Sequence, residues 1–387
     1  MGAEYPAKPP AVVALTTNGG RTRFNPNIYA GGKVCLSILG TWRAGRGEEW
    51  SSAQGIESIL LSIQSLMSSN PYENEPGFET TRSDTDKQAQ KSYASKIRHE
   101  SLRISVITRL EEFLAVDIPD RTAVVSSTDR TPVPVGEVVD DKSTRYDPFK
   151  ELCKHRFLWY YESYLAAIDT HGKETTANQP FKRTGFEGGG NGMDGSFKYA
   201  ELRQRLMNIR KALDIEMRGW IIEGAQAVKD EKLIAASLQR QFEQAVETYS
   251  ADESVTISLE LVNGNPFLWQ MIYYGRPMTN LDGGMFKIRL YFSTRFPDEL
   301  ARVRFETPLF HHRISKDGVP CLLPEATDEA KYYVEAVITL LEDEDPPYDP
   351  RTVVNPEATK LLWGSKEEKK EYSRRLRRAV SRSIEYE

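Results

Sequence analysis

The pattern of hydrophobic and polar positions predicts β-rich segments in two separate parts of the chain. In the first part, the runs AVVALTT (residues 11–17) and KVCLSIL (33–39) are apolar and rich in β-branched residues. In the second part, the strand pattern returns after residue 254, in the runs SVTISLELV, FLWQMIYYG, GGMFKIRLYF and ARVRFETPLF. Each run is short and ends near a turn signal, as expected for strands.

Hydrophobic residues at helical spacing predict helices between and after these strands. The first predicted helix covers residues 51–67, with Ser51 or Ser52 as its N-cap, and the second covers roughly 89–115. Asp147-Pro148 opens a third helix through cap and first-turn chemistry. Further helices are predicted at 197–223, at 231–249, after Cys321 in the run EATDEAKYYVEAVITLL, and in the basic C-terminal run SKEEKKEYSRRLRRAVSRSI.

The order of elements around Cys35 recurs around Cys321. Both parts read as strand, proline or aspartate corner, strand, polar turn, cysteine, helix, acidic proline-containing loop and helix. This order predicts an internal duplication at low sequence identity. Residues 117–146 lack sustained periodicity and contain prolines, so we interpret them as a linker.

Composition describes a globular chain of two or three domains. The 387 residues are 39% hydrophobic and 28% charged, and no apolar run approaches the roughly 20 residues of a membrane span. A net charge of −5 gives no bias toward nucleic acid or anionic lipid. The three cysteines, Cys35, Cys153 and Cys321, are far apart, which argues against a disulfide framework and predicts a reducing compartment, the cytosol or the nucleus.

Cys35 is the first candidate for chemistry. A free cysteine in an apolar run is usually a packing residue. Here, however, Gly31-Gly32 allows the chain to turn so that Asn27 folds back toward Cys35, and a side-chain amide beside a cysteine can stabilise a thioester oxyanion. The acidic loop NPYENEPG (70–77) brings Glu75 as a third candidate.

Three other site types find weaker support in the residues. A cysteine protease needs a histidine base, and the nearest, His99, lies within a predicted helix with no protease signature around Cys35. His311-His312 and the scattered cysteines lack zinc-ligand spacing. The glycine-rich run GFEGGGNGMDGS lacks the Lys-Ser/Thr of a phosphate-binding loop.

Taken together, YPAKPPAVVALTT, FNPNIYAGGKVCLSIL, a tryptophan before a serine-rich helix start, and NPYENEPGFE resemble a ubiquitin-conjugating domain. The runs SIQSLM, NEPGFE and KIRHE resemble the large Z-type conjugating enzymes in particular. The resemblance covers roughly residues 4–220. It implies that Cys35 accepts the modifier as a thioester, that Asn27 is the asparagine of the family's His-Pro-Asn motif, with Asn25 in place of its histidine, and that Glu75 orients and deprotonates the incoming lysine.

The resemblance also implies a fold and a set of partners. We expect an α+β protein with tandem ubiquitin-conjugating domains, each an antiparallel meander sheet with flanking helices. The expected boundaries are 1–116 for a first domain incomplete at its N-terminus, 117–146 for the linker, 147–230 for a helical extension, and 231–387 for a divergent second domain. The family domain begins with a helix and two strands that would precede YPAKPP, so we expect the sequence to be a fragment of a longer chain or a truncated gene model. The implied partners are ubiquitin or a ubiquitin-like modifier, an activating enzyme, a ligase and protein substrates, with no nucleic acid, no membrane and no bound cofactor.

In the second copy, Cys321 aligns with the active-site cysteine and Arg313 occupies the position of the motif asparagine. An arginine can stabilise negative charge, but its length and fixed fork differ from a short amide. Asp349 in PPYDP is the candidate acid, so Cys321 and Asp349 form a candidate second site. The alternative function is a non-catalytic adaptor of the ubiquitin pathway, or a degenerate scaffold of the same fold, in which one or both cysteines are relics.

Overall fold

The computed structural model describes residues 4–42, 45, 47–80, 83–116, 147–188, 192–251 and 257–385. The chain folds into two compact units, one made of Met1–Ile118 and Ala167–Leu206, the other of Pro119–Ala166 and Met207–Glu387. The predicted linker, 117–146, lies outside the described residues. None of the helices in the described ranges is long and apolar enough to cross a bilayer.

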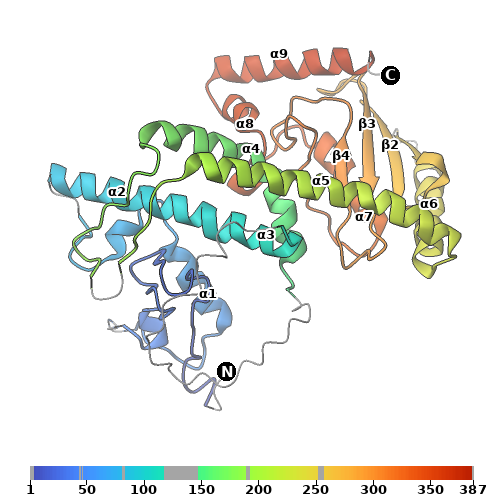
Figure 1. Ribbon diagram of the computed structural model, residues 1–387. Coiled ribbons are helices and arrows are strands. Elements are labelled where there is room, and N and C mark those ends of the chain that lie inside the picture. The colour runs from blue at the N-terminus through green and yellow to red at the C-terminus, as the bar shows by residue number, and fades with distance from the viewer. Residues whose placement is uncertain are drawn as a thin grey trace. The chain divides into compact units, whose positions relative to one another are not determined.

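The first unit is mostly helical. Its elements are η1 (Ser37–Leu39), α1 (Ile56–Leu66), η2 (Pro71–Asn74), α2 (Asp84–Glu100), the π-helix η3 (Ser101–Thr108), α3 (Arg109–Leu114), and parts of α4 (Lys150–Glu174) and α5 (Tyr199–Lys229) (Figure 1). The helix predicted at 89–115 begins earlier, at Asp84, because Ser83 and Asp86 form a capping box.

Two local predictions in this unit are wrong. The runs 11–17 and 33–39 form no strand among the described residues; a single bridge joins them, Val13 with Lys33, and Val34 forms another bridge with Ile28, outside both runs. An isolated pair of extended segments is marginal without further strands beside it, which explains why these runs do not become a sheet here. The helix α1 is capped by Gly55 and not by Ser51 or Ser52.

The second unit is built on a four-stranded antiparallel sheet in the order β1-β2-β3-β4, as the alternation predicts. Its strands are β1 (Ile257–Leu261), β2 (Leu268–Tyr274), β3 (Met285–Tyr291) and β4 (Arg302–Phe305). Leu259, Met271, Ile288 and Phe305 lie opposite one another in successive strands and point to the same side. The other elements are α6 (Leu233–Ala251), η5 (Val262–Gly264), α7 (Ala330–Glu342), η6 (Pro350–Thr352), α8 (Pro356–Leu362) and α9 (Lys366–Ser383).

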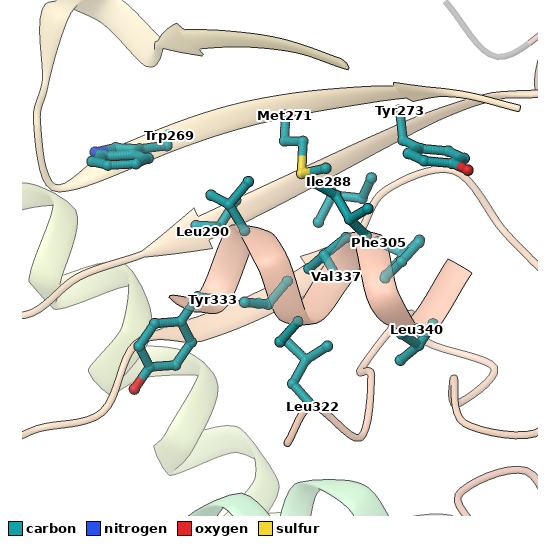
Figure 2. Close-up of a cluster of buried hydrophobic side chains, with 14 of the residues drawn as sticks. Trp269, Met271, Tyr273, Ile288, Leu290, Phe305, Leu322, Tyr333, Val337 and Leu340 are labelled. Carbon is teal, nitrogen blue, oxygen red and sulfur yellow. The ribbon is translucent and has the colours of Figure 1, made fainter. Parts of the chain in front are cut away.

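The core of this unit lies between that side of the sheet and α7 (Figure 2). Ile288 and Leu290 of the sheet and Val337 of α7 are fully buried in one cluster. The intervening residues Lys287 and Arg289 point to the other side, where burial is only partial. Alternation with period 2 therefore explains both the pairing and the burial of this sheet.

Candidate active site

Asn27 and Cys35 lie opposite each other across a tight turn. The Cys35 N–H donates to the Asn27 carbonyl at 2.8 Å, and the Asn27 Nδ2 donates to the Cys35 carbonyl at 3.1 Å. Gly32, with φ +89°, closes the turn, and a Cβ there would lie 2.6 Å from the Ala14 carbonyl oxygen. Only glycine fits this position, so the sequence pattern Gly31-Gly32 does bring Asn27 to Cys35.

Asn25 fixes the backbone before Asn27. Its Oδ1 accepts from the Asn27 N–H at 2.9 Å, and its Nδ2 donates to the Leu66 carbonyl at the end of α1 at 2.8 Å. The side chain is almost fully buried. These contacts support a structural role for the first position of the Asn-Pro-Asn motif.

The Cys35 thiol is covered in this structure. The residue is 2% exposed, and the Tyr29 phenol is hydrogen-bonded to the thiol. Burial, followed by the nearby thiol, raises the pKa of Tyr29. The amide nitrogen of Asn27 donates to the Cys35 carbonyl, while its Oδ1 is buried and has no hydrogen-bond partner among the described residues.

Glu75 directly follows η2 and is reached by Arg23. The Arg23 Nη2 lies 3.3 Å from Glu75 Oε2, and the guanidinium lies 4.8 Å from the centre of the Tyr29 ring. Burial raises the pKa of the Glu75 carboxyl above its usual value, while Arg23 opposes this rise. Cys35, Tyr29, Arg23 and Glu75 thus form one chain of contacts, in which the predicted residues Cys35 and Glu75 are the two ends.

Arg23 and Tyr29 were not found from the sequence. The one available signal in the sequence is the position of Arg23, a charged residue two positions before Asn25. This segment must be largely buried if the Asn-Pro-Asn motif is to pack against the rest of the fold. Its partner Glu75 is 52 residues away, so the contact itself depends on the fold.

The segment around Cys321 repeats the hydrogen bonds around Cys35 at an offset of 286 residues. The Cys321 N–H donates to the Arg313 carbonyl at 2.8 Å, as Cys35 does to Asn27. The Arg313 N–H donates to His311 Nδ1 at 3.2 Å, as Asn27 does to Asn25. The bridge between Ile314 and Pro320 corresponds to that between Ile28 and Val34.

The chemistry of the two cysteines differs. Cys321 is completely buried, and burial raises its pKa to about 11 although Arg313 acts in the opposite direction. Asp349 accepts hydrogen bonds from Arg351 Nε and Nη2, and these bonds lower the pKa of its carboxyl. The raised thiol pKa makes Cys321 a weak nucleophile, and the bonds from Arg351 make Asp349 a weaker proton acceptor, so this second site is poorly suited to acyl transfer.

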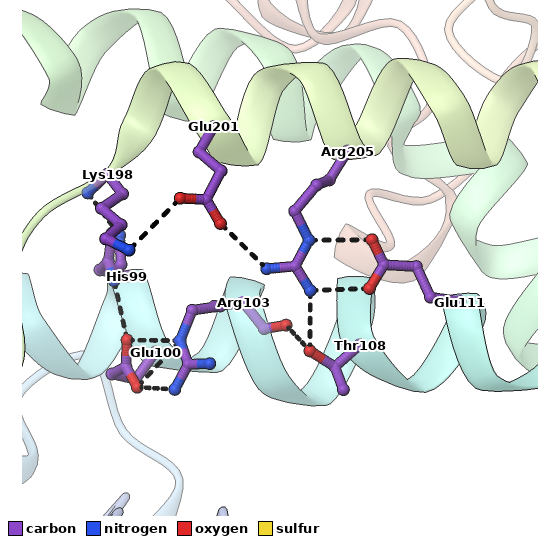
Figure 3. Close-up of polar contacts among 8 residues, drawn as sticks. All are labelled: His99, Glu100, Arg103, Thr108, Glu111, Lys198, Glu201 and Arg205. Carbon is purple, nitrogen blue, oxygen red and sulfur yellow. Dashed lines mark hydrogen bonds and ion pairs between the residues drawn. The ribbon is translucent and has the colours of Figure 1, made fainter. Parts of the chain in front are cut away.

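Two of the histidines weighed for other chemistries, His99 and His311, have hydrogen-bond partners in the fold. His99 Nε2 accepts from the Lys198 N–H at 3.0 Å, and its Nδ1 is bonded to Glu100 (Figure 3). His311 accepts from the Arg313 N–H. Within the described ranges, no three His, Cys, Asp or Glu side chains are grouped so as to hold a metal ion.

Comparison with known proteins finds matches of two kinds, to a family model and to individual relatives. The family model "Ubiquitin-conjugating enzyme" matches residues 1–101 and 238–380. The human protein named ubiquitin-conjugating enzyme E2 Z is 38% identical over 212 residues, which cover 54% of this chain and 47% of the human protein. The protein of the same name from Danio rerio is 55% identical over 108 residues, or 28% of this chain and 31% of the fish protein.

A third relative is the human protein named dual E2 ubiquitin-conjugating enzyme/E3 ubiquitin-protein ligase BIRC6. It is 39% identical over 110 residues, which cover 28% of this chain and 2% of that protein. The chain spans about half the length, or less, of the curated relatives described here.

Proposed function

Because the chain belongs to the ubiquitin-conjugating enzyme family, we propose that it accepts ubiquitin or a ubiquitin-like modifier as a thioester on Cys35 and passes it to a lysine. The similarity to the E2 Z proteins supports a Z-type enzyme. The observation that carries the proposal is the chain of contacts that joins Glu75 through Arg23 and Tyr29 to Cys35, at the turn where Asn27 meets Cys35.

The proposed reaction has two transfers. In the first, the Cys35 sulfur attacks the thioester carried by an activating enzyme, whose thiol leaves with the proton. In the second, a lysine amine attacks the carbonyl, an amide bond forms, and Cys35 leaves as a thiol. The activating enzyme consumes ATP, a ligase supplies the protein substrate, and the chain itself requires no bound cofactor.

Each predicted residue has a role that its environment supports. Asn27 lies where its amide can turn from the Cys35 carbonyl to the oxyanion of the tetrahedral intermediate. Glu75, whose burial favours proton uptake, orients the lysine and accepts its proton. The Tyr29 phenol must move from the Cys35 sulfur before the modifier can be attached, because that thiol is covered.

For the second unit we propose a divergent ubiquitin-conjugating domain, so that the protein has tandem domains with the boundaries predicted from the sequence. The split family match and the repeated hydrogen bonds around Cys321 support this arrangement. Burial of Cys321 and the arginine at 313 favour a non-catalytic role there, as an adaptor or scaffold, over a second site with Asp349. The free cysteines of the described chain agree with a reducing compartment, the cytosol or the nucleus.

One assay tests the enzymatic proposal against the adaptor. The chain is incubated with activating enzyme, ATP and ubiquitin, and a thiol-sensitive adduct is sought. We expect an adduct that disappears in Cys35→Ala and persists in Cys321→Ala. If the chain forms no adduct while a known conjugating enzyme does so in parallel, the adaptor replaces the enzyme as the best account.

A further inference from the structure

Arg23 is a buried cation at a position where burial costs free energy. It is 4% exposed, and its Nε has no hydrogen-bond partner in the described structure. A buried guanidinium with an unused donor is not an efficient way to stabilise a fold. Buried charges of this kind are found where function needs a fixed charge.

One nitrogen of Arg23 joins two parts of the site that are far apart in sequence. Nη2 donates to the Pro26 carbonyl, next to Asn27, and also to Glu75 Oε2 at 3.3 Å. The same guanidinium lies over the Tyr29 ring, and Tyr29 is bonded to the Cys35 thiol. Arg23 therefore fixes Glu75 relative to the motif that carries Asn27.

The glycine-rich segment after α4 also packs near the Arg23 guanidinium. The Phe186 ring lies 5.9 Å from the Arg23 guanidinium and packs edge-on against Tyr93 and Phe78, with centroids 5.1 and 5.2 Å away. Next to it, Glu187 forms a buried ion pair with Lys96 of α2. The described part of this segment is thus anchored, and it places the Phe186 ring over the Arg23 guanidinium.

We propose that Arg23 is a positioning residue, which holds the Glu75 carboxylate and the Tyr29 ring beside Cys35 during transfer to lysine. This inference rests on the proposed function. Glu75 is the group that acts on lysine, and Arg23 acts through it. Without Arg23, Glu75 keeps its burial but loses the charge that opposes protonation, so its carboxyl would hold a proton up to a higher pH.

The test is single-turnover discharge of the loaded Cys35 thioester onto free lysine between pH 6 and 9. Only loaded molecules are followed, so effects on loading do not enter. The variants are Arg23→Met, Arg23→Lys, Glu75→Gln and the double variant Arg23→Met/Glu75→Gln. The matched control is Arg21→Met, because Arg21 is exposed and its side chain donates to the nearby Asn18 carbonyl.

We expect Arg23→Met to discharge at least tenfold more slowly than the parent at pH 6.5, with the deficit shrinking as pH rises. Arg23→Lys should recover part of the rate, since lysine restores the positive charge but not the planar guanidinium with its several donors. In the Glu75→Gln background, Arg23→Met should add less than twofold. A deficit that is constant with pH, or effects of Arg23 and Glu75 that multiply fully, would overturn the inference.

A second readout separates this inference from the proposed function. The titration of the Glu75 carboxyl is followed by NMR in the uncharged parent and in Arg23→Met, whose fold is checked by its thermal transition. We expect the midpoint for Glu75 to move to higher pH in the variant. An unchanged midpoint overturns the role of Arg23 even in a chain that charges, and a shifted midpoint supports it even in a chain that never charges.

Discussion

Arg313 Nη2 donates to the backbone carbonyl of Cys321 at 2.8 Å, the same contact that Asn27 Nδ2 makes with the Cys35 carbonyl at 3.1 Å. Two different side chains thus satisfy the same backbone carbonyl after the same turn. The contact by itself is therefore structural, and what separates the two sites is the state of the sulfur and of the nearby carboxylate.

Cys321 should resist alkylation in the folded protein. With a pKa of about 11 in place of 9, its thiolate fraction at pH 8 falls by about 100-fold, and the side chain is fully buried as well. We expect iodoacetamide to label Cys321 at least 100-fold more slowly in the folded chain than in the chain unfolded by urea, as measured by mass spectrometry of the Cys321 peptide. Similar rates in the two states would show that the sulfur is accessible.

Gly32→Ala should destabilise the first unit, while Gly31→Ala should not. At Gly32 the backbone has φ +89°, and the added Cβ would lie 2.6 Å from the Ala14 carbonyl oxygen, whereas at Gly31 no atom lies within 4 Å of it. We expect a loss of about 2 kcal/mol or more for Gly32→Ala and a change within about 0.5 kcal/mol for Gly31→Ala in denaturant unfolding. Equal effects would contradict the turn that Gly32 closes between Asn27 and Cys35.

The ion pair between Arg205 and Glu111 should behave as a buried pair (Figure 3). Arg205 Nε and Nη2 donate to the two carboxylate oxygens at 2.8 and 2.7 Å, and both side chains are at most 5% exposed. Arg205→Met alone should cost about 3–5 kcal/mol in the free energy of unfolding, because it leaves Glu111 buried and unpaired.

The double variant Arg205→Met/Glu111→Leu provides the control for this pair. Since it removes both charges, we expect it to recover most of the stability lost in Arg205→Met. A double variant as unstable as the single one would mean that packing of the arginine, and not the charge left behind, accounts for the loss.

The sequence predicted the fold well where strand partners are close along the chain. The runs after residue 254 pair with their neighbours, so the alternation of Phe286, Ile288 and Leu290 became a sheet with the expected buried side. The run 11–17 is also apolar and rich in β-branched residues, but within the described residues its one bridge is from Val13 to Lys33. A strand-like pattern does not say whether a partner strand exists.

The proximity of Asn27 and Cys35 could be predicted from the sequence, but the contacts between distant segments could not. Cys35 and Asn27 are eight residues apart, and a Gly-Gly turn between them makes their proximity readable from sequence. By contrast, Arg23 meets Glu75 across 52 residues, and Lys96 meets Glu187 across 91. Such pairs depend on how helices and loops pack, and no local pattern encodes them.

His312 should make the second unit less stable in mild acid. The side chain is 2% exposed, neither ring nitrogen has a hydrogen-bond partner in the described structure, and the ring packs edge-on against Trp363 with centroids 4.9 Å apart. Burial, and then the charge of Arg313, lowers the pKa of His312 to about 4, against about 6.5 in the unfolded chain. Between these values the unfolded state binds the proton and the folded state does not, so stability falls as pH falls.

The expected size is about 1.4 kcal/mol per pH unit, or roughly 2 kcal/mol between pH 6.5 and 5. His312→Phe keeps an aromatic ring and removes the titration, so its free energy of unfolding should depend less on pH than that of the parent. Burial also lowers the pKa of His311 well below its usual value, so the variant should retain part of the slope. The measurement is denaturant unfolding of both proteins at several pH values from 7 to 5. If the two curves run parallel across that range, His312 takes up a proton equally in both states and its burial has no consequence for stability.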